Sequence, residues 1–197
     1  MAQKPSKETS KTDSGMKYSG KSLLLMLTAL ILCLAAVFLY GHFTTLRTTD
    51  DILQKAAKEC HIPIPEDSSL SLCGSCETDE NEHIFWFTAV DSQGENRYQP
   101  MHFTEVGDSK FKFRHAPKSF FSENDIAYDH YSRGIVYLVN NPACATIVFN
   151  AGTADEITVP VDNIPFIYKY EYKNLYKDND EEVITVQFLN RNGEIIM

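Results

Sequence analysis

The sequence lacks the short motifs that usually mark an enzyme. It contains no G-x-S-x-G, no H-E-x-x-H or H-x-H pair and no glycine-rich phosphate loop, and no paired carboxylates on a recognisable scaffold. These absences favour a protein that is not an enzyme, with no catalytic residues, no metal ligands and no cofactor. N-x-S/T sequons are also absent, so N-glycosylation is not expected.

Positive charge is scarce beyond the first 21 residues. Residues 1–21 hold five lysines against Glu8 and Asp13, a net charge of +3, and residues 22–41 hold no charge. Because the whole chain has a net charge of −9, residues 42–197 carry −12. A region this acidic repels phosphate backbones and anionic lipid headgroups. We therefore expect no nucleic-acid partner.

The 19-residue segment Ser22–Tyr40 contains no charge and is rich in leucine. As a helix rising about 1.5 Å per residue it covers roughly 28 Å, close to the thickness of the hydrocarbon core. Lysines precede it, and only Arg47 and Lys55 follow it closely, which places the N-terminus in the cytoplasm. The sequence thus predicts a disordered cytoplasmic tail over 1–21 and a transmembrane signal anchor over 22–41.

This organisation is that of a type II single-pass membrane protein whose C-terminal domain is extracellular or in the secretory-pathway lumen. A cleaved signal peptide is the main alternative, but the apolar run exceeds the usual 7–15 residues or so and no small-x-small site follows it. A buried helix of a soluble protein is the third possibility. It would need apolar partners on every face.

Residues 42–82 predict a helical stalk followed by a cysteine-containing linker. Thr48 or Thr49, followed by Asp50 and Asp51, is typical of a helix start, and an apolar stripe then continues to about Glu59. Residues 60–82 are rich in proline, serine and acidic side chains, which indicates irregular structure.

Four cysteines lie outside the apolar segment: Cys60, Cys73, Cys76 and Cys144. In an oxidising compartment an even number favours two disulfides, and three pairings are possible. The spacing Cys73-Gly-Ser-Cys76 is also that of a redox dithiol, although the strand–helix unit that normally activates one is missing. A zinc site that adds His61 is a further alternative, but oxidation outside the cytosol competes with metal binding.

Residues 83–197 contain short β-branched and aromatic runs separated by turn residues, which predicts a β-rich domain. Strands are expected over 83–90, 97–106, 111–115, 126–129, 135–139, 144–150, 156–161, 165–172 and 181–189. A short helical turn is expected within 118–125, and a hairpin turn at Asn192-Gly193. The fold class is therefore α+β, a mostly antiparallel β-sheet domain behind a single transmembrane helix.

One stretch of this domain resembles the central part of BRICHOS domains. The matching features are the hydrophobic-Tyr-Asp lead Ile126–Asp129, Tyr131, the aliphatic run Ile135–Val139, a proline-containing turn and Cys144 at the start of the next strand. The resemblance covers about residues 83–149, and the order of tail, anchor, linker and domain is also similar. The downstream cysteine of the family is missing here.

The resemblance implies an intramolecular chaperone for β-prone segments. Its client would be a hydrophobic β-prone peptide or the chain's own C-terminal segment, where residues 183–189 form an uncharged, strongly β-prone run. The alternative function is a membrane-tethered β-rich binding or assembly module without chaperone activity. A homo-oligomer is compatible with either.

Four residues of the resembling segment are candidate peptide-binding or structural residues. Asp129, just before an expected turn, is predicted to accept backbone N–H bonds, and the resemblance adds a pH-sensitive role. Tyr128, Tyr131 and Tyr137 are expected either to line a sheet face that holds an extended peptide or to pack in the core.

Overall fold

The structure is a computed structural model that describes residues 20–66, 68–79, 81–173 and 184–197. It divides into two compact units, Met1–Phe43 and Thr44–Met197. The first contains helix α1 (Gly20–Phe43), in which Lys21–Gly41 is long and apolar enough to cross a membrane. A signal sequence meets the same criteria of length and composition. The predicted tail lies almost entirely outside the described residues.

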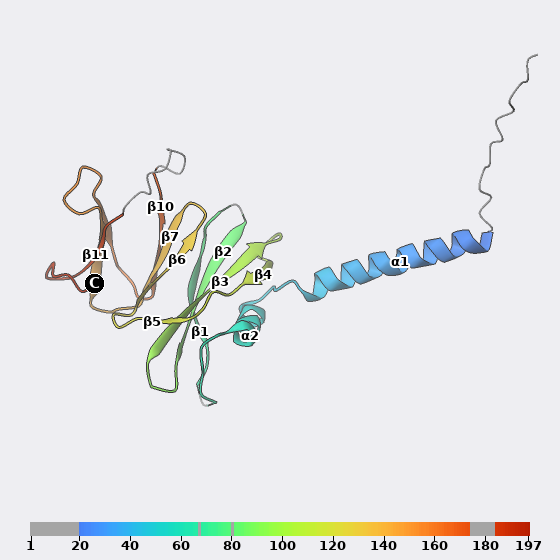
Figure 1. Ribbon diagram of the computed structural model, residues 1–197, viewed down its shortest axis with the longest axis horizontal. Coiled ribbons are helices and arrows are strands. Elements are labelled where there is room, and N and C mark those ends of the chain that lie inside the picture. Colours follow the sequence, from blue (N-terminus) through green and yellow to red (C-terminus); the bar gives the residue numbers. More distant parts are fainter. Residues whose placement is uncertain (1–19, 67, 80, 174–183) are drawn as a thin grey trace, which may run out of the picture. The chain divides into compact units, whose positions relative to one another are not determined.

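The described part of the second unit contains one helix, α2 (Thr49–Glu59), and eleven strands (Figure 1). The strands are β1 (Ser71–Glu77), β2 (Glu82–Val90), β3 (Asn96–Glu105), β4 (Phe111–His115), β5 (Phe120–Phe121), β6 (Ile126–Tyr131), β7 (Gly134–Val139), β8 (Cys144–Phe149), β9 (Ile157–Pro160), β10 (Phe166–Glu171) and β11 (Val186–Asn190).

These strands form three antiparallel sheets. Sheet A has the order β1-β2-β3-β4, with β5 also paired to β3; sheet B has the order β10-β7-β6; and sheet C has the order β11-β8-β9. The predicted mostly antiparallel α+β architecture is confirmed. Each of the expected strands overlaps an observed one, and residues 181–183 of the last one lie outside the described residues.

Sheet B lies between sheets A and C, because the side chains of its central strand β7 alternate between the two. Val136 and Leu138 belong to the hydrophobic cluster shared with sheet A, whereas Tyr137 and Val139 belong to the cluster shared with sheet C. All four side chains are buried. A strand that is buried on both faces has apolar residues at consecutive positions instead of alternating apolar and polar ones, as in the sequence of β7.

Helix α2 covers the other face of sheet A. Ile52 and Ala56 are buried against a cluster of aromatic and methionine side chains from β2 and β3. A capping box starts the helix: Thr48 Oγ1 accepts a hydrogen bond from Asp51 N at 3.1 Å, and the Asp51 carboxylate accepts one from Thr48 N at 3.0 Å. The predicted helix is confirmed. It packs on the sheet, however, and is no free stalk.

Two predicted irregular or helical segments are strands instead. Residues 71–77, expected in an irregular linker, form β1 along β2. Within the expected helical turn over 118–125, Phe120 and Phe121 form β5 and pair with Tyr98 and Arg97 of β3. Strand β1 pairs with the next strand along the chain, and β5 pairs with the earlier strand β3; in both segments this pairing overrides the local propensity.

The hairpin between β6 and β7 is tighter than the sequence predicts. The residue pattern predicts a five-residue turn over 130–134, but the turn consists of Ser132 and Arg133 alone. Tyr131 and Gly134 therefore face each other as the closing pair. Strand β6 consequently extends past Asp129, which lies within the strand and not before a turn.

Gly134 occupies a position with no room for a side chain. A Cβ there would collide with the backbone carbonyl oxygen of Tyr170 on β10. Because that oxygen belongs to the neighbouring strand, the clash could be relieved only by separating β7 from β10.

We expect Gly134→Ala to lower the free energy of unfolding by about 1–3 kcal/mol, because the added Cβ overpacks the contact between β7 and β10 at the hairpin end of sheet B. Urea denaturation followed by circular dichroism measures the change. Thr158→Ala, an exposed substitution in β9, is the control and should cost much less. Equal losses for the two variants would contradict this account of the glycine.

Candidate functional site

The outer side of β6 is an open sheet edge. Strand β6 is the last strand of sheet B, and no other described strand pairs with it on that side. The residues next to this edge also line two grooves. An open edge offers backbone N–H and C=O groups to an incoming chain.

The register shows which backbone groups point outward. In a two-residue hairpin the closing pair, Tyr131 and Gly134, exchanges hydrogen bonds, and along the strands bonded and non-bonded pairs alternate. Asp129 therefore bonds to β7. Ile126, Tyr128 and His130 belong to non-bonded pairs, so their N–H and C=O groups point away from β7.

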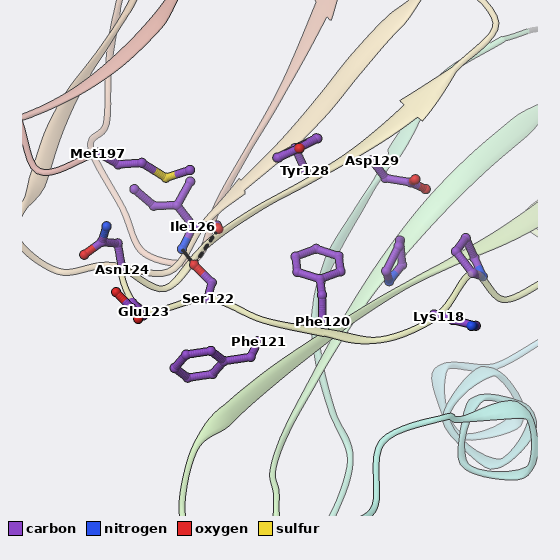
Figure 2. A pocket seen from close by; sticks show the side chains of 12 residues that line it. Lys118, Phe120, Phe121, Ser122, Glu123, Asn124, Ile126, Tyr128, Asp129 and Met197 are labelled. Carbon is purple, nitrogen blue, oxygen red and sulfur yellow. Dashed lines mark hydrogen bonds between the residues drawn. The ribbon is translucent and has the colours of Figure 1, made fainter.

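Ser122 confirms this assignment and closes one end of the edge. Its Oγ accepts a hydrogen bond from Ile126 N at 3.1 Å and donates one to Ile126 O at 2.7 Å, as Figure 2 shows. The outward groups of Ile126 are thus satisfied. Those of Tyr128 and His130 have no hydrogen-bond partner among the described residues.

Grooves lie on both sides of this edge. The larger, about 580 Å³, runs between β6 and the segment that carries β5 (Figure 2). Its lining includes Pro100, Phe120, Phe121 and Asp129. The smaller, about 290 Å³, lies on the side of sheet C and is lined by Tyr128, His130, Ile135, Tyr137, Val186 and Phe188, among others. Ile126, Tyr128 and Met197 line both.

Asp129 bonds to a histidine of sheet A and not to backbone N–H groups, which corrects the prediction. Its Oδ2 lies 2.7 Å from His102 Nε2, and the two side chains are only 18% and 16% exposed. The His115 ring stacks on His102 with the centroids 4.2 Å apart. Burial and the neighbouring His102 lower the pKa of His115. No local pattern in the sequence indicates this cluster, because its members lie on three strands.

The structure separates the three predicted tyrosines. Tyr128 is half exposed and lies 6.1 Å, centroid to centroid, from Tyr137, which is buried between sheets B and C. Burial raises the pKa of Tyr137 to about 12. Tyr131 lies on the opposite face of β6, packed against the cluster between sheets A and B. Tyr128 and Tyr137 thus share one groove, and Tyr131 lines neither.

All five cysteines are free, so the structure contradicts the predicted disulfides. Cys60 packs beside α2, Cys73 and Cys76 pack between sheets A and B, and Cys144 is buried between sheets B and C. Cys144 therefore has no cysteine within disulfide reach: sheet B lies between it and the Cys73–Cys76 pair, and sheets A and B lie between it and Cys60.

The same separation argues against the alternative zinc site, since Cys60 and the Cys73–Cys76 pair lie on opposite faces of sheet A. Among the described residues, no three His, Cys, Asp or Glu side chains come together as metal ligands. Cys73 and Cys76 share a face only because β1 has a register shift between Leu72 and Gly74. Burial raises the pKa of both thiols to about 11.

Comparisons with protein-family models, curated proteins and solved structures find no match to this chain. The BRICHOS resemblance therefore stays a prediction, and the open edge of β6 is the feature from which a function has to be inferred.

The raised thiol pKa values lead to a kinetic prediction. At pH 7.5, a pKa of about 11 leaves roughly 100-fold less thiolate than the ordinary value of 9. The greater nucleophilicity of a high-pKa thiolate offsets about tenfold of this. Iodoacetamide should thus alkylate Cys73 and Cys76 at least about tenfold more slowly in the folded chain than in urea, as measured by mass spectrometry. Equal rates would contradict the buried placement.

Proposed function

We propose that residues 44–197 form a peptide-binding module that takes up an extended peptide as an additional strand of sheet B, beside β6. The observation that carries this proposal is the pair of residues, Tyr128 and His130, whose backbone groups point outward and have no hydrogen-bond partner in the described part of the chain. Strand addition of this kind uses main-chain hydrogen bonds for affinity and pockets for alternate side chains for specificity.

The grooves match what an added strand would present. Successive side chains of a strand point to opposite faces. The residues opposite Tyr128 and His130 would face the groove toward sheet C, and the residue between them would face the groove toward sheet A. Two exposed apolar residues that line the grooves offer further contact surface: Phe121 is 40% exposed and Tyr128 is 49% exposed.

Replacing an outward N–H should remove binding without unfolding the protein. In His130→Pro the lost N–H makes no bond to β7, and proline is tolerated on edge strands. We expect this full-length variant in detergent micelles to bind a fluorescent, capped peptide of alternating valine and threonine about tenfold more weakly than the parent. Fluorescence anisotropy measures the affinity.

His130→Thr is the matched control, because it also loses the imidazole, which lies 3.4 Å from the Tyr172 hydroxyl, but keeps the backbone N–H. Its affinity should stay within about threefold of the parent's. Circular dichroism checks that both variants are folded. If folded His130→Pro and His130→Thr bind the peptide equally well, strand addition at β6 is excluded.

Chaperone activity of BRICHOS type is the second candidate, because the same edge would cap a growing β-aggregate. The chain's own residues 186–190 already form β11, with Phe188 buried in the core, so the client would be a separate molecule.

The variants His130→Pro and His130→Thr also distinguish a chaperone from a plain binding module. A chaperone should delay fibril growth of a peptide covering residues 181–197, and His130→Pro should do so less than His130→Thr. Binding without delay favours the plain binding module.

We further propose that α1 anchors the module as a type II membrane protein. The length and apolar composition of Lys21–Gly41 and the lysines that precede it support this. Protease added outside intact cells should then remove the module and leave the N-terminal tail protected. Digestion of the tail with protection of the module would reverse the orientation, and a mature chain lacking α1 would indicate a cleaved signal sequence.

A further inference from the structure

The open edge of β6 carries a carboxylate between its two outward-pointing residues. Asp129 lies between Tyr128 and His130, and its side chain projects into the groove on the side of sheet A (Figure 2). If a peptide adds antiparallel, like every described strand pair in the domain, its residue opposite Asp129 forms a non-hydrogen-bonded pair. Side chains approach most closely in such pairs, with Cα atoms about 4.5 Å apart.

Asp129 retains the capacity to bind a second group. Its Oδ2 contacts His102, whereas Oδ1 has no hydrogen-bond partner among the described residues. Two other charged residues line the same groove, Lys118 and Glu123, and their charges offset each other. Next to His102 lie the stacked ring of His115 and, beyond it, the oppositely charged pair Arg114 and Glu82. The carboxylate therefore faces the position where one ligand side chain would lie.

This charge argues against a second copy of the chain as the occupant. Two β6 edges that pair antiparallel through all their free groups would place Tyr128 opposite His130 of the other copy. Asp129 would then lie directly opposite Asp129. Like charges directly opposite each other destabilise a strand pair, and each module already carries most of the chain's negative charge.

We propose that the peptide bound at β6 carries a lysine or arginine opposite Asp129, flanked on both sides by apolar residues. This inference rests on the proposed function and specifies its ligand. The basic side chain pairs with the free Oδ1 of Asp129. The flanking residues face the groove lined by Tyr137, Val186 and Phe188. The acidic surface of the module attracts such a peptide before contact.

Three capped peptides that differ only in the central residue test the proposal on full-length protein in detergent micelles: Val-Lys-Val, Val-Thr-Val and Val-Glu-Val within a common alternating valine and threonine sequence. A cross-strand ion pair corresponds to an affinity difference of up to about fivefold. The lysine peptide should therefore bind about three- to fivefold more tightly than the threonine peptide, and the glutamate peptide more weakly still. High salt should reduce these differences.

Asp129→Asn keeps the size of the side chain and an acceptor for His102 but removes the charge, so it should abolish the preference for lysine. Glu123→Gln removes the charge of the other acidic side chain that lines the groove, on an exposed residue, and should leave the preference intact. If both variants lose the preference equally, overall charge and not the position of Asp129 is responsible, and the inference is wrong.

The peptide series on the unmodified protein gives a decisive result even if Asp129→Asn does not fold. Equal affinity for the three peptides would overturn the inference and leave the proposed function standing. If none of the three binds, strand addition at β6 fails, and the inference fails with it.

Discussion

The burial of sheet B on both faces is the constraint on which the rest of the structure depends. Its central strand, β7, pairs with β10 and β6 at its two edges and packs against sheets A and C on its two faces. Every direction around β7 is therefore filled with protein. Sheet B can be extended on the side of β6, where grooves flank the strand and the outward backbone groups of two residues find no partner among the described residues.

An open edge is usually a liability, because it can template aggregation. Here the exposed length is restricted. Ser122 satisfies Ile126 at one end, and the tight turn at Ser132 and Arg133 ends the strand at the other. Asp129, held by His102, places a charge in the middle. A short, charged edge of this kind disfavours indiscriminate pairing while leaving room for a peptide of matching chemistry.

The helices and most strands could be predicted because their signals are local. The start of α2 is marked by Thr48, Asp50 and Asp51. The apolar runs of β2, β7 and β8 already predict strands without knowledge of the tertiary contacts. Predictions failed where pairing or packing outweighs the local pattern. Strands β1 and β5 have weak local preference and depend on pairing with β2 and β3. The expected disulfides assumed proximity, whereas the four cysteines outside α1 are distributed over three separate clusters of side chains.

By itself, the sequence determined the apolar helix and the acidic β-rich domain, because hydropathy, charge and periodicity are properties of neighbouring residues. Only the tertiary structure decided which strand is left at an edge, which of its backbone groups are free, and that His102 is the partner of Asp129. Those features depend on the register of β6 against β7 and on the stacking of three sheets. The register is fixed by which two residues form the β6–β7 turn, and the residue pattern predicts a longer turn. The stacking is set by contacts between residues far apart in the chain, which a local pattern does not encode.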